Sequence, residues 1–283
     1  MSFGPLVTSE WFAREGDAAD VVLFDASTYL PNEAKSGHEE YLKAHIPGAR
    51  FFDIDAFSDP DTPLPHTVPS QGRFARLIGA QGVDNASRVV VYDQKGLFSA
   101  ARAWWLFRYF GHERVAVLDG GLPKWLAEGR PSETGEPAAV TERTFETNVH
   151  TRRLRGLGDV LEVIDHRDTL ILDARAANRF DGSTAEARPG VASGHIPGSH
   201  NLPYSRLLRS DHTLLPADSL RALFAEAGVD GNKAVITSCG SGVTAAVLLL
   251  GLEIAGLPEA ALYDGSWTEW GGRQDTPKAT GVV

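Results

Sequence analysis

The chain has 283 residues, of which 42% are hydrophobic and 23% charged, as is usual for a globular protein long enough for about two domains. Its formal net charge of −10 argues against nucleic acid as a partner, because phosphate binding needs a basic surface. No apolar run approaches the ~20 residues of a membrane span, and the N-terminal residues lack the features of a secretory signal.

Cysteine usage narrows the chemistry further. Cys239 is the only cysteine, so an internal disulfide is excluded, as is a zinc site with two or more thiolate ligands. Together with the missing signal, this pattern predicts a protein of the reducing cytoplasm.

Three short strings recur in order along the chain. VLFDAS at 22–27 is similar to LILDAR at 170–175, HIPGAR at 45–50 to HIPGSH at 195–200, and VLDGGLPKW at 117–125 to LYDGSWTEW at 262–270. The copies are 145 to 150 residues apart, which predicts two tandem copies of one domain. We expect the first domain at 1–130, a linker rich in Pro, Gly, Thr and Glu at 131–151, and the second domain at 152–283.

Each half alternates short apolar runs with amphipathic ones. In the second half, the pattern predicts buried strands at 170–173, 234–238 and 261–263, and helices at 217–228 and 244–256. Strand and helix alternation of this kind predicts an α/β fold, in which each domain is a mostly parallel sheet flanked by helices.

Cys239 lies between the predicted strand at 234–238 and the very apolar helix that follows. Ligands of parallel sheets gather at the carboxyl ends of strands. Gly240 and Gly242 allow a tight turn whose N–H groups point inward, next to a helix N-terminus that favours an anion. A thiolate held in this way is a good nucleophile.

Other interpretations of the loop fit its residues less well. A lone cysteine is most often a small buried apolar residue, but a Gly-x-Gly turn directly after it has no obvious packing purpose. A phosphate-binding loop lacks its Gly-Lys-Ser/Thr string here. Cysteine phosphatases place an arginine six residues after the nucleophile, where this chain has Ala245. Sulfur transfer, in which the thiolate keeps a sulfur atom as a persulfide, needs no such arginine.

The sequence resembles the tandem rhodanese-like sulfurtransferases at several places. The string CGSGVTA at 239–245 is similar to the active-site loop of the 3-mercaptopyruvate sulfurtransferase family, and the HIPG turns and DG-x-x-x-x-W strings are similar to marks of both rhodanese domains. The resemblance extends from FDAS at 24–27 to YDGSWTEWGGR at 263–273. Thiosulfate sulfurtransferases of this fold usually carry basic residues where this chain has Gly240 and Ser241.

The resemblance implies a role for particular residues. Cys239 matches the persulfide-forming nucleophile, and Arg179 and Arg188 match the arginines that bind the substrate's carboxylate and keto oxygens. The family's serine, histidine and aspartate set matches Ser241, His66 and Asp55, of which the last two come from the first half of the chain. The remaining loop residues expected to bind the substrate are Gly240, Gly242, Val243 and Thr244.

The first half lacks a cysteine at the corresponding place. It has YDQKGLFSAA at 92–101 where the second has TSCGSGVTAA, so that half cannot form a persulfide. His45 and His195, within the HIPG turns, are interpreted as structural.

The resemblance implies an enzyme that moves sulfur from 3-mercaptopyruvate through a Cys239 persulfide to cyanide, a thiol or a thioredoxin-type protein, and releases pyruvate. No metal or organic cofactor is expected, and neither nucleic acid nor a membrane is expected as a partner. Two alternatives stay open at this point. One is a thiosulfate:cyanide sulfurtransferase, and the other is a persulfide carrier that delivers sulfur to a partner protein.

Overall fold

The computed structural model describes residues 3–166 and 168–281, which form two compact units. The first unit contains the chain up to Pro60 together with Val68–His150 and Arg209–Leu214. The second contains Asp61–Thr67, Thr151–Leu208 and the chain from Leu215 onward. Each unit therefore includes a short segment from the other half of the sequence. The expected boundaries at 130 and 152 stay predictions.

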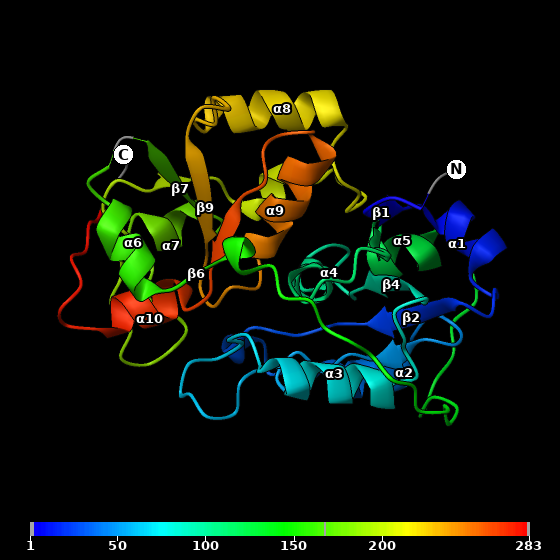
Figure 1. The fold of residues 1–283 in the computed structure, drawn as a ribbon. Coiled ribbons are helices and arrows are strands. Elements are labelled where there is room, and N and C mark those ends of the chain that lie inside the picture. The colour runs from blue at the N-terminus through cyan, green and yellow to red at the C-terminus, as the bar shows by residue number, and fades with distance from the viewer. Residues whose placement is uncertain (1–2, 167, 282–283) are drawn as a thin grey trace. The chain divides into compact units, whose positions relative to one another are not determined.

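The first unit is built on a five-stranded parallel sheet with the order β1-β5-β4-β2-β3 (Figure 1). Its strands are β1 (Leu6–Val7), β2 (Val21–Asp25), β3 (Arg50–Phe51), β4 (Arg88–Tyr92) and β5 (Val115–Leu118). Its helices are α1 (Ser9–Glu15), α2 (Gly37–Lys43), α3 (Gln71–Ala80), α4 (Ala100–Tyr109) and α5 (Gly121–Ala127), with a 3-10 turn η1 (Pro31–Glu33).

Both faces of this sheet are buried, which explains the nearly continuous apolar runs of its central strands. On one face, Leu23 and Val90 pack with Trp11 of α1, Tyr41 of α2 and Trp125 of α5. The other face carries a cluster of aromatic rings from the helices α3 and α4 and from the loops beside them, namely Phe52, Phe57, Phe74, Phe107, Phe110 and Phe145. The core of the first unit therefore lies on both sides of the sheet.

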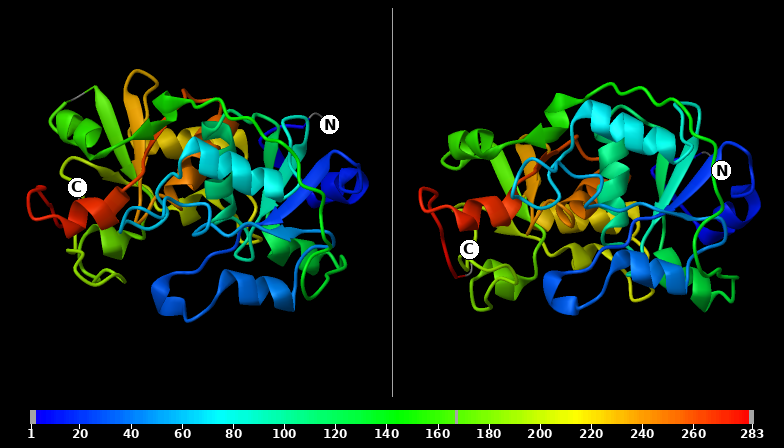
Figure 2. Two further views of the ribbon diagram at one scale, coloured as in Figure 1. Left: turned by 60° about the horizontal axis from the view of Figure 1, so that its bottom comes forward. Right: turned by 90° about the horizontal axis from the view of Figure 1, so that it is seen from below.

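The stretch 131–150 has no helix or strand, and it follows the surface of the first unit (Figure 2). Beside α3, the Arg143 N–H donates to the Gly79 carbonyl at 2.9 Å. A Cβ at Gly79 would stand 2.3 Å from the Arg143 carbonyl oxygen, so the close approach requires glycine. Phe145 is 5% exposed and packs against Phe74. These contacts fix the stretch against the first unit.

The second unit repeats the arrangement with the order β6-β10-β9-β7-β8, again all parallel. Its strands are β6 (Leu154–Arg155), β7 (Thr169–Asp173), β8 (His200–Asn201), β9 (Ala234–Ser238) and β10 (Ala261–Tyr263). Its helices are α6 (Leu157–Val163), α7 (Ala177–Phe180), α8 (Ala217–Glu226), α9 (Ala245–Ile254) and α10 (Ser266–Gly272), with 3-10 turns η2 (Thr151–Arg153) and η3 (Tyr204–Leu207). The predicted α/β fold of two tandem domains is confirmed.

Helix α9 is buried along its length, as its apolar sequence predicts. It packs against β9, α8 and η3, and a Cβ at Gly251 would stand 2.5 Å from a methyl group of Leu207. In Figure 1, α8 and α9 cover one face of the sheet, and α6, α7 and α10 lie on the other. The N-terminus of α9 is held rigidly as a result.

The two sheets correspond residue by residue at the carboxyl ends of their central strands. Asp25 pairs with Tyr92 in the first unit, and Asp173 pairs with Ser238 in the second. The next residue along the chain is Asp93 in one unit and Cys239 in the other.

No helix among the described residues is long and apolar enough to cross a membrane.

Candidate active site

Cys239 stands at the carboxyl end of β9, with its side chain in the loop that leads into α9. Its exposed fraction is 2%. Gly242 has φ +76°, a left-handed conformation that favours glycine. Gly240 has no such φ, but a Cβ there would stand 3.3 Å from a terminal nitrogen of Arg179. Gly242 is therefore required for backbone conformation, whereas a side chain at Gly240 would press on the end of Arg179.

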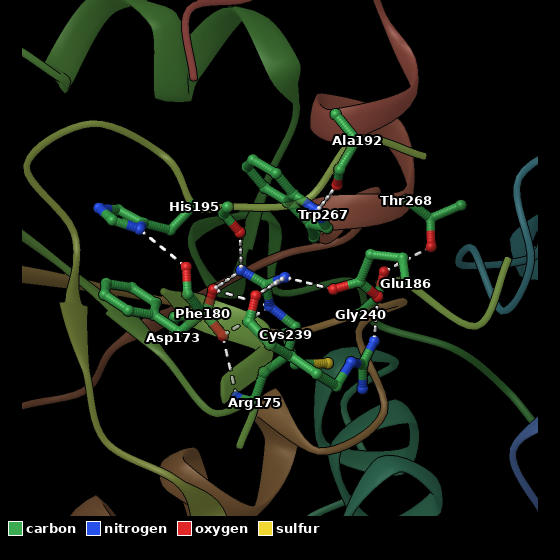
Figure 3. A network of polar contacts seen from close by, with 12 residues as sticks. Asp173, Arg175, Phe180, Glu186, Ala192, His195, Cys239, Gly240, Trp267 and Thr268 are labelled. Atoms are coloured by element: carbon green, nitrogen blue, oxygen red, sulfur yellow. Dashed lines mark hydrogen bonds and ion pairs between the residues drawn. The ribbon is translucent and has the colours of Figure 1, made fainter. Parts of the chain in front are cut away.

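The start of α10 fixes the carbonyl groups of this loop. The Trp267 N–H donates to the Cys239 carbonyl at 2.9 Å, and both the N–H and the hydroxyl of Thr268 donate to the Gly240 carbonyl, at 2.8 and 2.6 Å (Figure 3). Ser266 accepts a hydrogen bond from the Cys239 N–H at 3.2 Å. These hydrogen bonds fix the backbone of the loop against the start of α10.

The first unit shows what such a loop binds. One oxygen of the Asp93 carboxylate accepts hydrogen bonds from the N–H groups of Phe98, Ser99 and Ala100, at 2.7, 2.9 and 2.9 Å. Turns that enter a helix bind anions in this way. In the second unit, the N–H groups of Val243 and Thr244 have no acceptor among the described residues. The loop after Cys239 can therefore hold a negatively charged group.

Arg179 lies beside the loop and is held by a buried carboxylate. Its side chain is 23% exposed, and its guanidinium pairs with Glu186. Glu186 also pairs with Arg175 at 2.7 Å, and Arg175 pairs with Asp173 at 2.7 Å (Figure 3). Arg188 is half-buried two residues after Glu186, in the segment before β8.

His66 and Ser241 are brought together. The Nδ1 atom of His66 lies 2.8 Å from the Ser241 hydroxyl oxygen, and His66 has φ +63°. The segment Asp61–Thr67 belongs to the second unit although it precedes the sheet of that unit by about a hundred residues. Asp55 lies in an exposed turn of the first unit, where its N–H donates to Asp53 at 3.0 Å. The predicted role of Asp55 stays a prediction.

Several residues that shape this site were not predicted from the sequence. Asp173 and Arg175 belong to the repeated string at 170–175, and Glu186 lies in the segment that contains Arg179 and Arg188. Ser266 and Thr268 belong to the repeated string at 262–270. A signal was available, because an Asp-x-Arg directly after a buried strand places two opposite charges at the ligand-binding edge of the sheet. Among the described residues, no three His, Cys, Asp or Glu side chains gather as a metal site.

His45 and His195 occupy matching places in the two HIPG turns. Both are buried, at 2% and 1% exposed. His45 makes a hydrogen bond from Nδ1 to the Tyr41 carbonyl and stacks on the Tyr41 ring, whereas His195 does the same with Phe180. These contacts support the structural interpretation of both histidines.

Comparison with known proteins agrees with the two-domain fold and with the family that the sequence resembles. The sequence pattern of the rhodanese-like domain matches residues 8–128 and 157–273. The chain is 42% identical to a 3-mercaptopyruvate sulfurtransferase of Escherichia coli strain K12, over 98% of both chains. It is 41% identical to the mitochondrial thiosulfate/3-mercaptopyruvate sulfurtransferase 1 of Arabidopsis thaliana, over 96% of this chain and 77% of that protein.

Its fold is similar to the crystal structure of SseA from Escherichia coli, described as a 3-mercaptopyruvate sulfotransferase with the rhodanese fold. The TM-score is 0.84 and the identity 40%, with 93% of this chain and 99% of that chain covered. The family matches the two sheet-containing halves separately, and the related sequences cover nearly the full length. The chain therefore belongs to the rhodanese-like family, as a tandem of two such domains.

Proposed function

We propose that the protein is a 3-mercaptopyruvate sulfurtransferase that works through a persulfide of Cys239. The observation that carries the proposal is Cys239 itself, which is buried at the carboxyl end of β9 in a loop built to hold an anion. The names of the full-length relatives support the choice of substrate. Loops of this kind stabilise the charge of a thiolate and, after sulfur transfer, of a persulfide.

In the first half-reaction, the Cys239 thiolate attacks the sulfur atom of 3-mercaptopyruvate. A sulfur–sulfur bond forms while the carbon–sulfur bond of the substrate breaks, and its electron pair moves into the enolate of pyruvate. Protonation of the enolate releases pyruvate. The N–H groups of Val243 and Thr244 are placed to stabilise the negative charge on the outer sulfur.

Arg179 and Arg188 would bind the carboxylate and keto oxygens of the substrate. A guanidinium binds planar carboxylates through two parallel hydrogen bonds. Arg179 stands against Gly240, next to the nucleophile, so a substrate bound there has its sulfur close to Cys239. Stabilising the enolate oxygen in this position would lower the barrier to breaking the carbon–sulfur bond.

Ser241 and His66 would handle the proton of the substrate thiol. The 2.8 Å contact between the His66 ring nitrogen and the Ser241 hydroxyl joins a base to a hydroxyl within the cysteine loop, which is the arrangement for general acid and base catalysis. Asp55 is the aspartate that we propose for this set, on the resemblance of the sequence to the family. The proton taken from the substrate thiol is then available to convert the enolate into pyruvate.

In the second half-reaction, an acceptor thiolate or cyanide attacks the outer sulfur of the persulfide. The sulfur–sulfur bond breaks and the Cys239 thiolate is restored. We propose small thiols and a thioredoxin-type protein as the acceptors. We also place the protein in the cytoplasm, where a single catalytic thiol stays reduced.

The test is the initial rate of sulfur transfer with each donor. With 2-mercaptoethanol as acceptor, kcat/KM for 3-mercaptopyruvate is expected to exceed that for thiosulfate by at least ~10-fold, because Gly240 and Ser241 place no charge beside Cys239 for a compact dianion. A higher kcat/KM for thiosulfate would contradict the proposed donor. A single loading of sulfur without turnover would instead indicate a carrier.

A further inference from the structure

Four charged side chains form a buried row behind the cysteine loop. Arg175 and Asp173 have side chains that are 1% and 2% exposed, and Glu186 is 4% exposed. Arg179, at 23%, is the member of the row that reaches solvent. The charges alternate in sign and sum to zero, which is the condition under which buried charges are tolerated.

Arg175 is well bound without Glu186. It donates to both carboxylate oxygens of Asp173 and to the Gly194 carbonyl, the latter at 2.8 Å. Its guanidinium also lies 4.7 Å from the centre of the Trp267 ring (Figure 3). Burial by itself lowers the pKa of Arg175, but the Asp173 and Glu186 carboxylates outweigh burial and raise it. Charge balance at Arg175 is thus largely supplied by Asp173.

Glu186 divides its two oxygens between two arginines. Oε1 accepts from Arg175 and Oε2 accepts from Arg179. An arginine side chain has several rotatable bonds and loses much conformational freedom when it is fixed. A carboxylate anchored by the buried Arg175 can hold the Arg179 guanidinium in one place, against Gly240 of the cysteine loop.

We propose that Glu186 is a positioning residue that fixes Arg179 for the reaction of Cys239. The inference rests on the proposed function for the meaning of Arg179, although the contact itself does not. The buried row also contacts a residue that positions Cys239. The Arg175 guanidinium lies over the Trp267 ring, and the backbone N–H of Trp267 donates to the Cys239 carbonyl. The same buried charges therefore contact both Arg179 and the residue that holds the Cys239 backbone.

The negative charge of Glu186 opposes the attraction of Arg179 for an anionic substrate. If attraction alone mattered, removing that charge would lower KM. A positioning role predicts a different pattern, in which kcat falls by at least ~10-fold while KM stays within about threefold of the parent value. If the variant were partly unfolded, kcat would fall only as much as the fraction of molecules that take up sulfur. A larger fall in kcat therefore indicates a loss of positioning.

The variant to make is Glu186→Gln. Its one carbonyl oxygen can serve the buried Arg175, and its amide NH₂ then faces Arg179, which it cannot bind. The matched control is Glu226→Gln. Glu226 pairs with Arg206 at 2.9 Å, where both side chains are exposed, and its loss is expected to leave kcat and KM unchanged.

A second readout does not depend on the donor. Phenylglyoxal modifies arginine through the neutral guanidine, so a carboxylate that pairs with the guanidinium slows it. Peptide mapping by mass spectrometry is expected to show Arg179 modified at least ~3-fold faster in Glu186→Gln than in the parent, with Arg206 unchanged. An unchanged rate at Arg179 would overturn the inference, whether or not 3-mercaptopyruvate is the donor.

The double variant with Arg179→Ala decides between positioning and a general effect on the fold. If Glu186 acts through Arg179, Glu186→Gln changes kcat/KM by less than about twofold once Arg179 is alanine. Equal losses in both backgrounds would overturn the inference. Should Glu186→Gln fail to fold, Glu186→Asp keeps the charge but is too short to span both arginines, and the same faster modification of Arg179 is expected. A parent protein that does not use 3-mercaptopyruvate would count against the proposed function alone.

Discussion

His66 has a backbone conformation that few residues with side chains adopt. Its φ of +63° is matched by His212, with φ +65°. The two histidines stand at matching places, each a few residues before a helix, α3 or α8. His66 reaches Ser241 in the cysteine loop, whereas His212 lies against Gly96 in the corresponding loop of the first unit. The pair allows the imidazole to be tested separately from the backbone.

The substitution His66→Asn removes the imidazole and keeps a residue that tolerates positive φ. We expect kcat with 3-mercaptopyruvate to fall by about 100-fold, the range of general acid and base catalysis, with a change in the free energy of unfolding below about 1 kcal/mol. His212→Asn is the control, and its kcat should match the parent. Equal activity of the two variants would remove His66 from the mechanism.

At the scale of single residues, the sequence predicts a functional residue when its neighbours along the chain indicate its role. Cys239 and its glycines stand out because a strand, a turn and a helix follow one another directly. Glu186 does not stand out, because its partners Arg175 and Arg179 are joined to it only by the folded chain. The grouping of His66 with the second unit is likewise absent from the order of the residues.

At the scale of elements, the loop after β4 and the loop after β9 both lead from a strand into a helix, but their N–H groups serve different acceptors. Asp93 fills its own loop with a carboxylate, and the cysteine loop leaves N–H groups for an anion brought by the reaction. The first loop is therefore a structural element that stabilises the start of α4.

Asp93→Asn is expected to lower the free energy of unfolding by about 2–3 kcal/mol, because three N–H groups lose a charged acceptor. Urea titration followed by fluorescence measures the change. Asp230→Asn is the control, since Asp230 accepts two N–H groups in an exposed loop, and its cost should stay below about 1 kcal/mol. Equal costs for the two variants would show that the Asp93 loop is no special anion site.

Elements with a strong local pattern were predicted closely. The strand predicted at 234–238 is β9 with the same bounds, and the helix predicted at 244–256 is observed at Ala245–Ile254. The strands β3, β6 and β8 have two residues each, too few for a periodic pattern. Their place at the sheet edges is set by pairing with a neighbour, which only the folded chain supplies.

At the scale of the whole molecule, the repeated strings predicted two tandem domains of one fold, and the family is confirmed. The central strands of both sheets end in a buried aspartate, Asp25 or Asp173. Asp173 is paired with Arg175, whereas Asp25 is hydrogen-bonded to the neutral residues Ser27 and Gln94. The two copies therefore differ in how the charge of this buried carboxyl group is balanced.

Burial raises the pKa of Asp25 to about 6, and the hydrogen bonds from Ser27 only partly offset it. Since the unfolded value is ~3.9, the associated stability is fully present below about pH 4 and is lost as the pH rises through about 6. Asp25→Asn removes this dependence. The free energy of unfolding of the variant minus that of the parent should rise by about 2–3 kcal/mol between pH 4 and pH 7. A difference that stays flat or falls would contradict the assignment.

The central claim is that Cys239 carries the sulfur, and intact-mass spectrometry of the native protein tests it most directly. After treatment with 3-mercaptopyruvate, the parent is expected to gain ~32 Da, the mass of one sulfur atom in a persulfide, and to lose it on addition of cyanide. Cys239→Ser should gain nothing while its thermal unfolding matches the parent. Sulfur retained by Cys239→Ser, or no gain by the parent, would contradict the account.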